Sequence, residues 1–169
     1  MTFQKILVAL ELSPRDESVF SEALNLAKNV GAQLSLIHCL SDLTEMAMMS
    51  QTGLDTGYAI PVTPSASTMS PAMVNIDLIK EANITKHQQV EKHLALYQKQ
   101  ASSLGVSVEC KCYESTGNTG SQICRIAQDL NVDLIILGRK GHNAIAEALL
   151  GSVSNYVLHH APCAILVIQ

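Results

Sequence analysis

The segment from Asp133 to Gln169 reads DLIILGRKGHNAIAEALLGSVSNYVLHHAPCAILVIQ, and its pattern decides the fold of the chain. Two apolar runs that predict strands, Asp133–Leu137 and Cys163–Ile168, flank a glycine-rich loop and a helix that ends before Pro162. A strand, a glycine-rich loop and a helix opened by a hydroxyl residue suit the binding of an anionic group. Glycines allow close backbone approach, and the first amides of the helix lack internal partners.

The rest of the chain alternates apolar runs with segments of helical period. Lys5–Leu10 is continuously apolar, as is typical of a central strand covered on both faces. Two more strands are predicted at Leu34–Leu40 and Val106–Tyr113, and helices are predicted from Asp16 to Gly31, over Asn75–Leu104 and from Gly117 to Leu130. This alternation predicts a three-layer α/β sandwich around a five-stranded parallel sheet.

Single residues refine these predictions. Asp16 can cap the first helix, while Gly31 and Gly105 are signals for helix ends. In the long helix, apolar side chains spaced by four and three residues predict one buried stripe: Val90, Leu94, Tyr97, Ala101 and Leu104.

The expected binding crevice lies where the strand order of such a sheet reverses, beyond the carboxyl ends of the strands. We expect the first and fourth strands to meet there. This arrangement brings Ala9, Leu10 and Glu11 beside the loop from Gly138 to Ser154, so the two strongest local signals share one crevice.

Residues 41–74 interrupt the alternation. They contain five methionines among many Ser, Thr, Gly and Pro residues, without a clean period. A structureless stretch of this length is unusual inside a compact domain. It is interpreted either as an excursion without a fixed role or as a segment that covers the site or docks a partner, since methionine suits adaptable contacts.

Composition narrows the classes of partner. The 169-residue chain is one domain by length, and its net charge of −4 argues against non-specific nucleic-acid binding. No apolar run is long enough to span a membrane, and because residues 1–5 lead directly into the first predicted strand without a charged and an apolar region, we expect no leader peptide. Five cysteines without a C-x-x-C pair or zinc-type spacing favour free thiols in a cytosolic protein.

The remaining chemistry-bearing residues form no catalytic constellation that the sequence reveals, with no metal-ligand cluster and no general base beside the expected phosphate. Other readings of the singled-out residues stay open. The three loop glycines are compatible with tight turns alone, and Ser152 with a helix cap. His38, inside a strand, is interpreted as a buried histidine with a hydrogen-bond partner.

Gly138-x-x-Gly141, nine residues and then Gly151-Ser152 form the phosphate-loop spacing of the ATP-binding branch of the universal stress protein family, which this chain resembles. The flanking segments agree, with KILVAL first, LSLIHCL in the second strand, VDLIILG before the loop and LLGSVSNYVLHHAPCAILVI last. The resemblance covers the chain except residues 41–74. It implies a Rossmann-like sheet, similar to the adenine nucleotide alpha hydrolases, with strand order 3-2-1-4-5.

The resemblance also implies a ligand, ATP or AMP, and residues that bind it. The adenosine would contact Ala9, Leu10, Glu11, Cys39, Leu137 and Gly138, and the phosphates would contact Gly141, Gly151, Ser152, Val153 and Ser154. A Mg²⁺ ion carried by the nucleotide would need few protein ligands.

Two departures from the family pattern stand beside this assignment. The usual Asp after the first strand is Glu11, whose side chain is longer by one methylene, and a loop-capping role for it stays open. The loop begins with Arg139-Lys140 and continues with His142, which places positive charge beside the expected phosphates. Solvated surface charge is the alternative interpretation.

The resemblance implies a cytosolic regulator that responds to stress, in which nucleotide occupancy shifts a conformational equilibrium. Two other hypotheses remain open: a slow ATPase or phosphotransfer enzyme in the same pocket, and a nucleotide-free protein whose segment 41–74 docks a protein partner.

The last strand, Cys163–Ile168, is expected at a sheet edge. A long apolar edge promotes aggregation unless another strand pairs with it. Antiparallel pairing with the same strand of a second copy would cover the edge with two-fold symmetry. The family resemblance implies the same homodimer.

Overall fold

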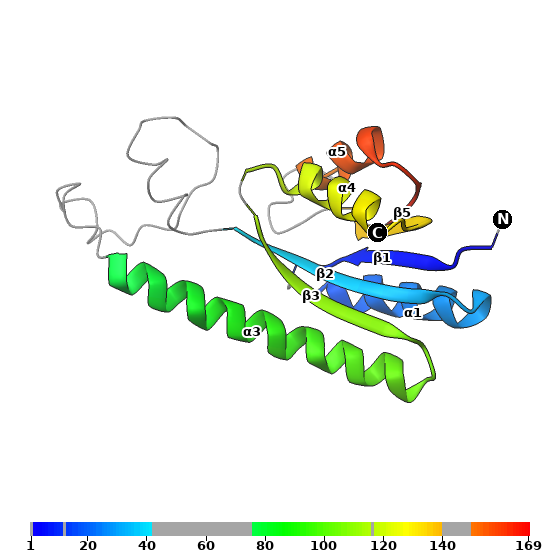
Figure 1. The fold of residues 1–169 in the computed structure, drawn as a ribbon, viewed down its shortest axis with the longest axis horizontal. Coiled ribbons are helices and arrows are strands. Elements are labelled where there is room, and N and C mark those ends of the chain that lie inside the picture. The colour runs from blue at the N-terminus through cyan, green and yellow to red at the C-terminus, as the bar shows by residue number, and fades with distance from the viewer. Residues whose placement is uncertain (1, 12, 42–75, 116, 140–149) are drawn as a thin grey trace.

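The computed structural model describes residues 2–11, 13–41, 76–115, 117–139 and 150–169, in which it holds five strands and four helices (Figure 1). In chain order these are β1 Lys5–Ala9, α1 Asp16–Val30, β2 Gln33–Ser41, α3 Ile76–Ser103, β3 Val108–Ser115, α4 Thr119–Asp129, β4 Leu134–Gly138, α5 Ser152–His160 and β5 Ala164–Ile168. Every predicted strand is present within two residues of its expected ends. Residues 42–75, which include the methionine-rich segment after residue 41, lie outside the described residues.

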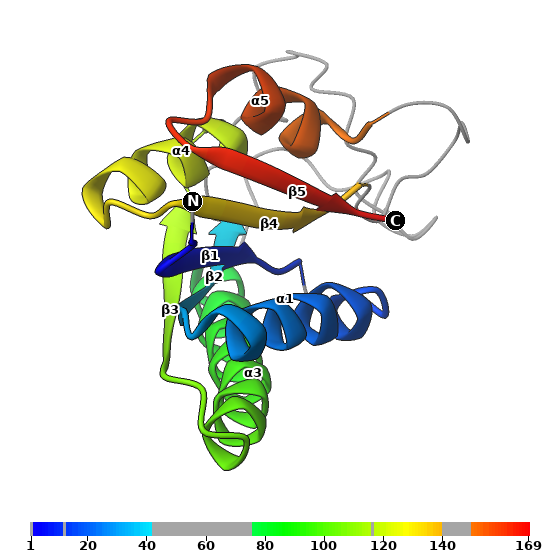
Figure 2. The ribbon, with the colours of Figure 1, turned by 90° about the vertical axis from the view of Figure 1, so that its right-hand side faces the viewer.

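The five strands form one parallel sheet in the order β3-β2-β1-β4-β5, which confirms the expected topology. Ile6 of β1 pairs with Leu34 of β2 on one side and with Leu134 of β4 on the other. Helices α1 and α3 cover one face of the sheet, and α4 and α5 cover the other (Figure 2). Within the described ranges, no helix has the length and apolar character needed to cross a bilayer.

Strand β1 is apolar after Lys5 because helices cover both of its faces. Ile6, Leu7 and Val8 are fully buried. Ile6 and Val8 pack with α1 and α3, whereas Leu7 packs with α4 and α5. Since side chains of a strand alternate between faces, a doubly covered strand needs apolar residues at successive positions.

The start of α1 corrects the prediction for Asp16, which is the first helical residue and not the cap. Arg15 occupies the cap position without a side-chain hydrogen bond to the helix. Asp16 is only 3% exposed, and its Oδ1 accepts the Glu11 N–H at 3.2 Å and the Ser13 hydroxyl at 3.3 Å. The carboxylate therefore holds the loop after β1. The other end agrees with prediction, since Gly31 ends α1 at φ 72°.

Helix α3 buries the predicted stripe except at its last member. The buried members are at most 6% exposed: Val90, Leu94, Tyr97 and Ala101. Leu104 is 47% exposed, because α3 ends at Ser103 and the chain turns away at Gly105, whose φ is 76°. The prediction that Leu104 is buried was therefore wrong.

Helices α4 and α5 approach each other closely at Gly120. A Cβ added to Gly120 would lie 2.8 Å from Cβ of Tyr156 and 3.0 Å from its Cγ and Cδ1. Separations this short do not occur between real side chains, so the present approach of the two helices requires glycine.

We expect Gly120→Ala to lower the free energy of unfolding by about 1–3 kcal/mol, because Tyr156 and α5 must shift to admit the methyl group. Urea denaturation measures the change. Ser121→Ala, at the next and exposed position of α4, is the control and should stay within about 0.5 kcal/mol of wild type. Equal stability of Gly120→Ala and the control would contradict the close approach.

Candidate functional site

The carboxyl ends of β1 and β4 lie side by side, as the sequence predicts. Ala9, the last residue of β1, pairs in register with Leu137 of β4, and Gly138 pairs with Ile168 of β5. Helix α1 follows β1 on one face of the sheet, and α5 follows β4 on the other (Figure 2). This junction is the reversal point at which open parallel sheets bind ligands.

Hydrogen bonds at Arg139 tie the end of β4 to the start of α5. The Arg139 N–H donates to the Ile168 carbonyl at 2.7 Å, and the Arg139 carbonyl accepts the Gly151 N–H at 2.8 Å. The Ser154 hydroxyl donates to the carbonyls of Arg139 at 2.7 Å and Gly151 at 3.0 Å, and Ser154 is 2% exposed. The Ser154 hydroxyl therefore holds the end of β4 against the start of α5 from inside the protein.

The first turn of α5 presents backbone amides at this edge. Gly151 is the cap residue, with φ −62° and ψ 158°, so the helix begins at Ser152 and the alternative interpretation of Ser152 as its cap is wrong. The first bond of the helix runs from the Asn155 N–H to the Gly151 carbonyl at 2.8 Å. The N–H groups of Ser152, Val153 and Ser154 precede this bond and have no acceptor carbonyl within the helix. They therefore carry the positive end of the helix dipole.

An apolar wall lies on the α4 and α5 side of the junction. Ala9, Cys39 and Val153 are half-buried against the cluster that contains buried Leu137. Burial raises the pKa of the Cys39 thiol to about 11, so this thiol is neutral at physiological pH. Leu10 is separated from this group, because its side chain packs on the α1 and α3 face and is 4% exposed.

The other predicted site residues lie at the rim or outside the described ranges. Glu11 is exposed and Arg139 is half-buried. A Cβ added to Gly138 would make only an ordinary contact, with its nearest neighbour at 3.6 Å. Gly141 and His142 lie outside the described residues, so their predicted contacts remain predictions.

His38 is buried beneath this edge, which confirms the expectation of a hydrogen-bonded histidine. It is 7% exposed, and its Nδ1 lies 2.8 Å from the Leu10 carbonyl. Because a carbonyl only accepts, Nδ1 carries the proton. Burial lowers the pKa of His38 below its ordinary 6.5, outweighing the opposite effects of the Leu10 carbonyl and Asp16, and Lys86 and His87 of α3 act in the same direction as burial.

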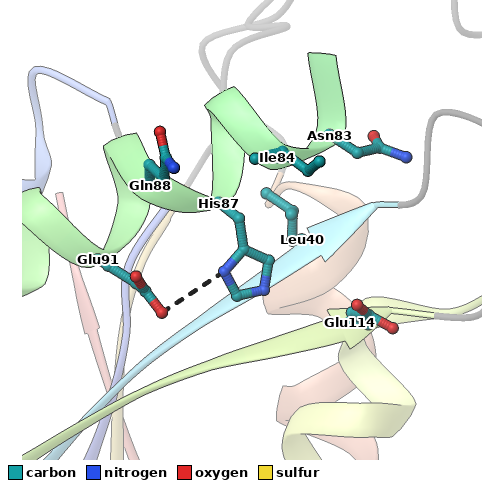
Figure 3. A pocket seen from close by; sticks show the side chains of 7 residues that line it. All are labelled: Leu40, Asn83, Ile84, His87, Gln88, Glu91 and Glu114. Carbon is teal, nitrogen blue, oxygen red and sulfur yellow. Dashed lines mark ion pairs between the residues drawn. The ribbon is translucent and has the colours of Figure 1, made fainter. Parts of the chain in front are cut away.

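Sequence reasoning missed a cavity of about 340 Å³ at the carboxyl ends of β2 and β3, away from the junction of β1 and β4 (Figure 3). It is lined by Leu40, Asn83, Ile84, His87, Gln88, Glu91 and Glu114. The signal was available in α3, where the apolar stripe gives way to Asn83 and His87 toward the amino end. At its wall His87 Nδ1 lies 3.7 Å from an oxygen of Glu91, one turn further along α3.

The described part of the chain contains neither a cluster of metal-binding side chains nor a disulfide bond. No three His, Cys, Asp or Glu side chains there are grouped as metal ligands would be. All five cysteines are free. Burial raises the pKa of the Cys110 thiol to about 11, which is typical of an inert, packed thiol.

The sheet order and the helix start at its reversal point define a Rossmann-like α/β protein. The sequence profile of the universal stress protein family matches residues 2–169, and the protein belongs to this family. Its relatives include universal stress protein Sll1388 of Synechocystis, which is 30% identical over 100% of this chain and 99% of the relative.

Solved structures share the fold. Universal stress protein UspA from Lactobacillus plantarum superimposes with a TM-score of 0.74 at 21% identity, covering 100% of this chain and 99% of that one. A universal stress protein in complex with cAMP matches with a TM-score of 0.59 at 16% identity, covering 100% and 98% of the two chains. The universal stress protein from Archaeoglobus fulgidus in complex with dAMP gives 0.57 at 17% identity, covering 100% of both.

We expect the contribution of His38 to the free energy of unfolding to fall as the pH is lowered through about 6.5 and to become constant below the depressed pKa of folded His38. The folded state binds the proton less readily than the unfolded state, so added protons favour unfolding over this window. Urea denaturation at a series of pH values measures the slope.

His38→Asn is the matched variant for this measurement, because the Asn amide can donate from the position of Nδ1 but does not titrate. Its stability should depend less steeply on pH between 6.5 and the lowered pKa. Identical slopes for wild type and His38→Asn would contradict the assignment.

Proposed function

We propose that this protein binds an adenine nucleotide, ATP or AMP, between β1 and β4, and that it works as a cytosolic regulator. The observation that supports the proposal most directly is the start of α5, which lies against the ends of β4 and β5 through the Arg139 bonds. Amides at a helix start and the helix dipole stabilise phosphate. The family structures in complex with cAMP and dAMP support an adenine nucleotide as the ligand class.

The proposed ligand spans the junction with its base toward β1 and β2. Ala9, Cys39 and Leu137 supply the apolar surface for the adenosine, because they belong to one cluster on one face. Gly151 and the amides of the first turn of α5 hold the phosphates, together with Gly141, Arg139 and His142 of the loop. A Mg²⁺ ion would then be held mainly by the nucleotide.

Regulation in this proposal is a population shift. Nucleotide binding stabilises the form in which the glycine loop and the ends of β1 and β4 are held in one geometry. A ligand that binds only this form raises its stability by RT ln(1 + L/Kd), where L is the ligand concentration, and so with the logarithm of that concentration once it exceeds Kd. Binding without turnover is sufficient for such a switch.

We expect Ser152→Glu to weaken ATP binding at least tenfold, or about 1.4 kcal/mol. Ser152 is exposed in the first turn of α5, so its replacement brings a negative charge beside the proposed phosphates. The same charge complements the helix dipole, so stability without ligand should stay equal or rise slightly. Calorimetric titration with ATP and thermal denaturation separate the two effects.

Ser121→Glu is the matched control, because Ser121 is also exposed in the first turn of a helix, α4, which follows β3 at the far side of the sheet. It adds the same charge and should leave ATP affinity within about twofold of wild type. If Ser152→Glu binds ATP with wild-type affinity, the proposal that the start of α5 binds the phosphates is contradicted.

The proposal includes a homodimer through β5, the edge strand of the sheet. The Ala164 N–H donates to the Asp133 carbonyl at 3.2 Å, and the Ile168 carbonyl accepts from Arg139. Because ladder bonds alternate between the two sides of a strand, Ile165 and Val167 direct their backbone groups to the outer edge. Leu166 remains 37% exposed in the single chain. Such an edge suits pairing with a second copy.

We expect Val167→Pro to convert the dimer to a monomer, because proline removes an N–H from the outer edge and leaves the bonds to β4 in place. Sedimentation velocity measures the mass of the assembly. Val167→Ala keeps the N–H and should remain dimeric. A wild-type protein that sediments as a monomer at micromolar concentration would contradict the dimer itself.

A further inference from the structure

The peptide unit between Leu10 and Glu11 is held from both sides by buried side chains. On one side the Leu10 carbonyl accepts the Nδ1–H of His38 at 2.8 Å. On the other the Glu11 N–H donates to Oδ1 of Asp16 at 3.2 Å. His38 is 7% exposed and Asp16 is 3% exposed, so water competes little for either bond.

The planarity of the peptide bond makes these two contacts a single constraint. In a trans peptide the carbonyl and the N–H point in opposite directions from one rigid plane. A partner on each end therefore fixes the rotation of that plane, and with it the direction in which the chain leaves β1. Glu11 is the next residue and is exposed at the rim of the junction with β4.

These two hydrogen bonds also occur where the backbone hydrogen bonds of the sheet end. The Leu10 N–H still donates to the Ile37 carbonyl of β2 at 2.9 Å, one residue beyond the end of β1. The His38 imidazole then takes the Leu10 carbonyl, and the Ser13 hydroxyl, 3.3 Å from Asp16 Oδ1, continues the network into the loop. Side chains replace the strand ladder from this point onward.

We propose that His38 and Asp16 are positioning residues of the nucleotide site, which clamp the Leu10–Glu11 peptide and so aim the Glu11 carboxylate at the ribose or base. This inference rests on the proposed function, in which Glu11 contacts the adenosine. The longer side chain of Glu11 has more rotatable bonds than an aspartate, so a fixed backbone origin limits the entropy that binding must remove.

The test compares His38→Leu, which removes the donor, with His38→Asn, whose amide N–H occupies the position of Nδ1. Loss of one buried neutral hydrogen bond corresponds to about three- to tenfold in an equilibrium constant. We expect His38→Leu to weaken ATP binding and to accelerate amide exchange at Glu11 by factors in this range. His38→Asn should return both to within about twofold of wild type.

A stability control separates positioning from general damage. Leu94→Ala creates a cavity in the same layer of the core, at a residue that is 3% exposed and belongs to α3. It should lower the unfolding midpoint without changing ATP affinity or Glu11 exchange under native conditions. If Leu94→Ala weakens ATP binding as much as His38→Leu does, the positioning role is overturned.

Other outcomes also decide the inference. Equal loss of affinity in His38→Leu and His38→Asn, or no loss in His38→Leu, overturns it. If His38→Leu does not fold, Asp16→Ala and Asp16→Asn form the replacement pair, since Asn retains the Oδ1 acceptor for Glu11. If the wild type binds no adenine nucleotide, the proposed function fails, whereas unchanged Glu11 exchange in these variants overturns the clamp independently.

Discussion

The parallel pairing of β1 with β4 is the constraint on which the rest of the structure depends. It makes β1 the centre of the sheet, and it sends the following helices to opposite faces. A central strand needs apolar side chains on both faces, which explains why Ile6, Leu7 and Val8 are fully buried. The same pairing brings Ala9 beside Leu137 and leaves a junction at the carboxyl edge. Fold and candidate site therefore have one physical origin.

The elements of the fold were predictable from sequence because their signals are local. Apolar runs locate β1, β4 and β5, and Gly31 and Gly105 locate the two helix ends that precede β2 and β3. The errors occur at helix termini: Leu104 lies just beyond the end of α3, and two others lie at helix starts. Asp16 and Ser152 are both acceptable caps by residue type, yet each lies one position inside its helix. Asp16 instead bonds the loop before its helix, and the Gly151 N–H before Ser152 bonds Arg139, so residue type alone does not decide which neighbour becomes the cap.

The location of the candidate site was predictable from sequence, but the hydrogen bonds and packing contacts that hold its residues in place were not. Strand order and the loop spacing place Ala9, Leu137 and the start of α5 together, and the structure groups them. The hydroxyl of Ser154 bonding to Arg139, and the imidazole of His38 bonding to Leu10, join residues that are 15 and 28 positions apart. The approach of Gly120 to Tyr156 is likewise a result of packing two helices. Such contacts require the assembled fold.

The distribution of charge along the junction favours one orientation of the proposed ligand. The chain has a net charge of −4, and Glu11 adds a carboxylate at the β1 end of the junction. A phosphate beside Glu11 would be repelled, whereas at the start of α5 it meets amides, the helix dipole and Arg139. A hydroxyl or amino group, in contrast, can donate to Glu11. The junction thus favours a ligand with neutral donors at one end and negative charge at the other. An adenine nucleotide has this polarity, and the reverse orientation would place its phosphates beside the Glu11 carboxylate and leave the start of α5 without an anion.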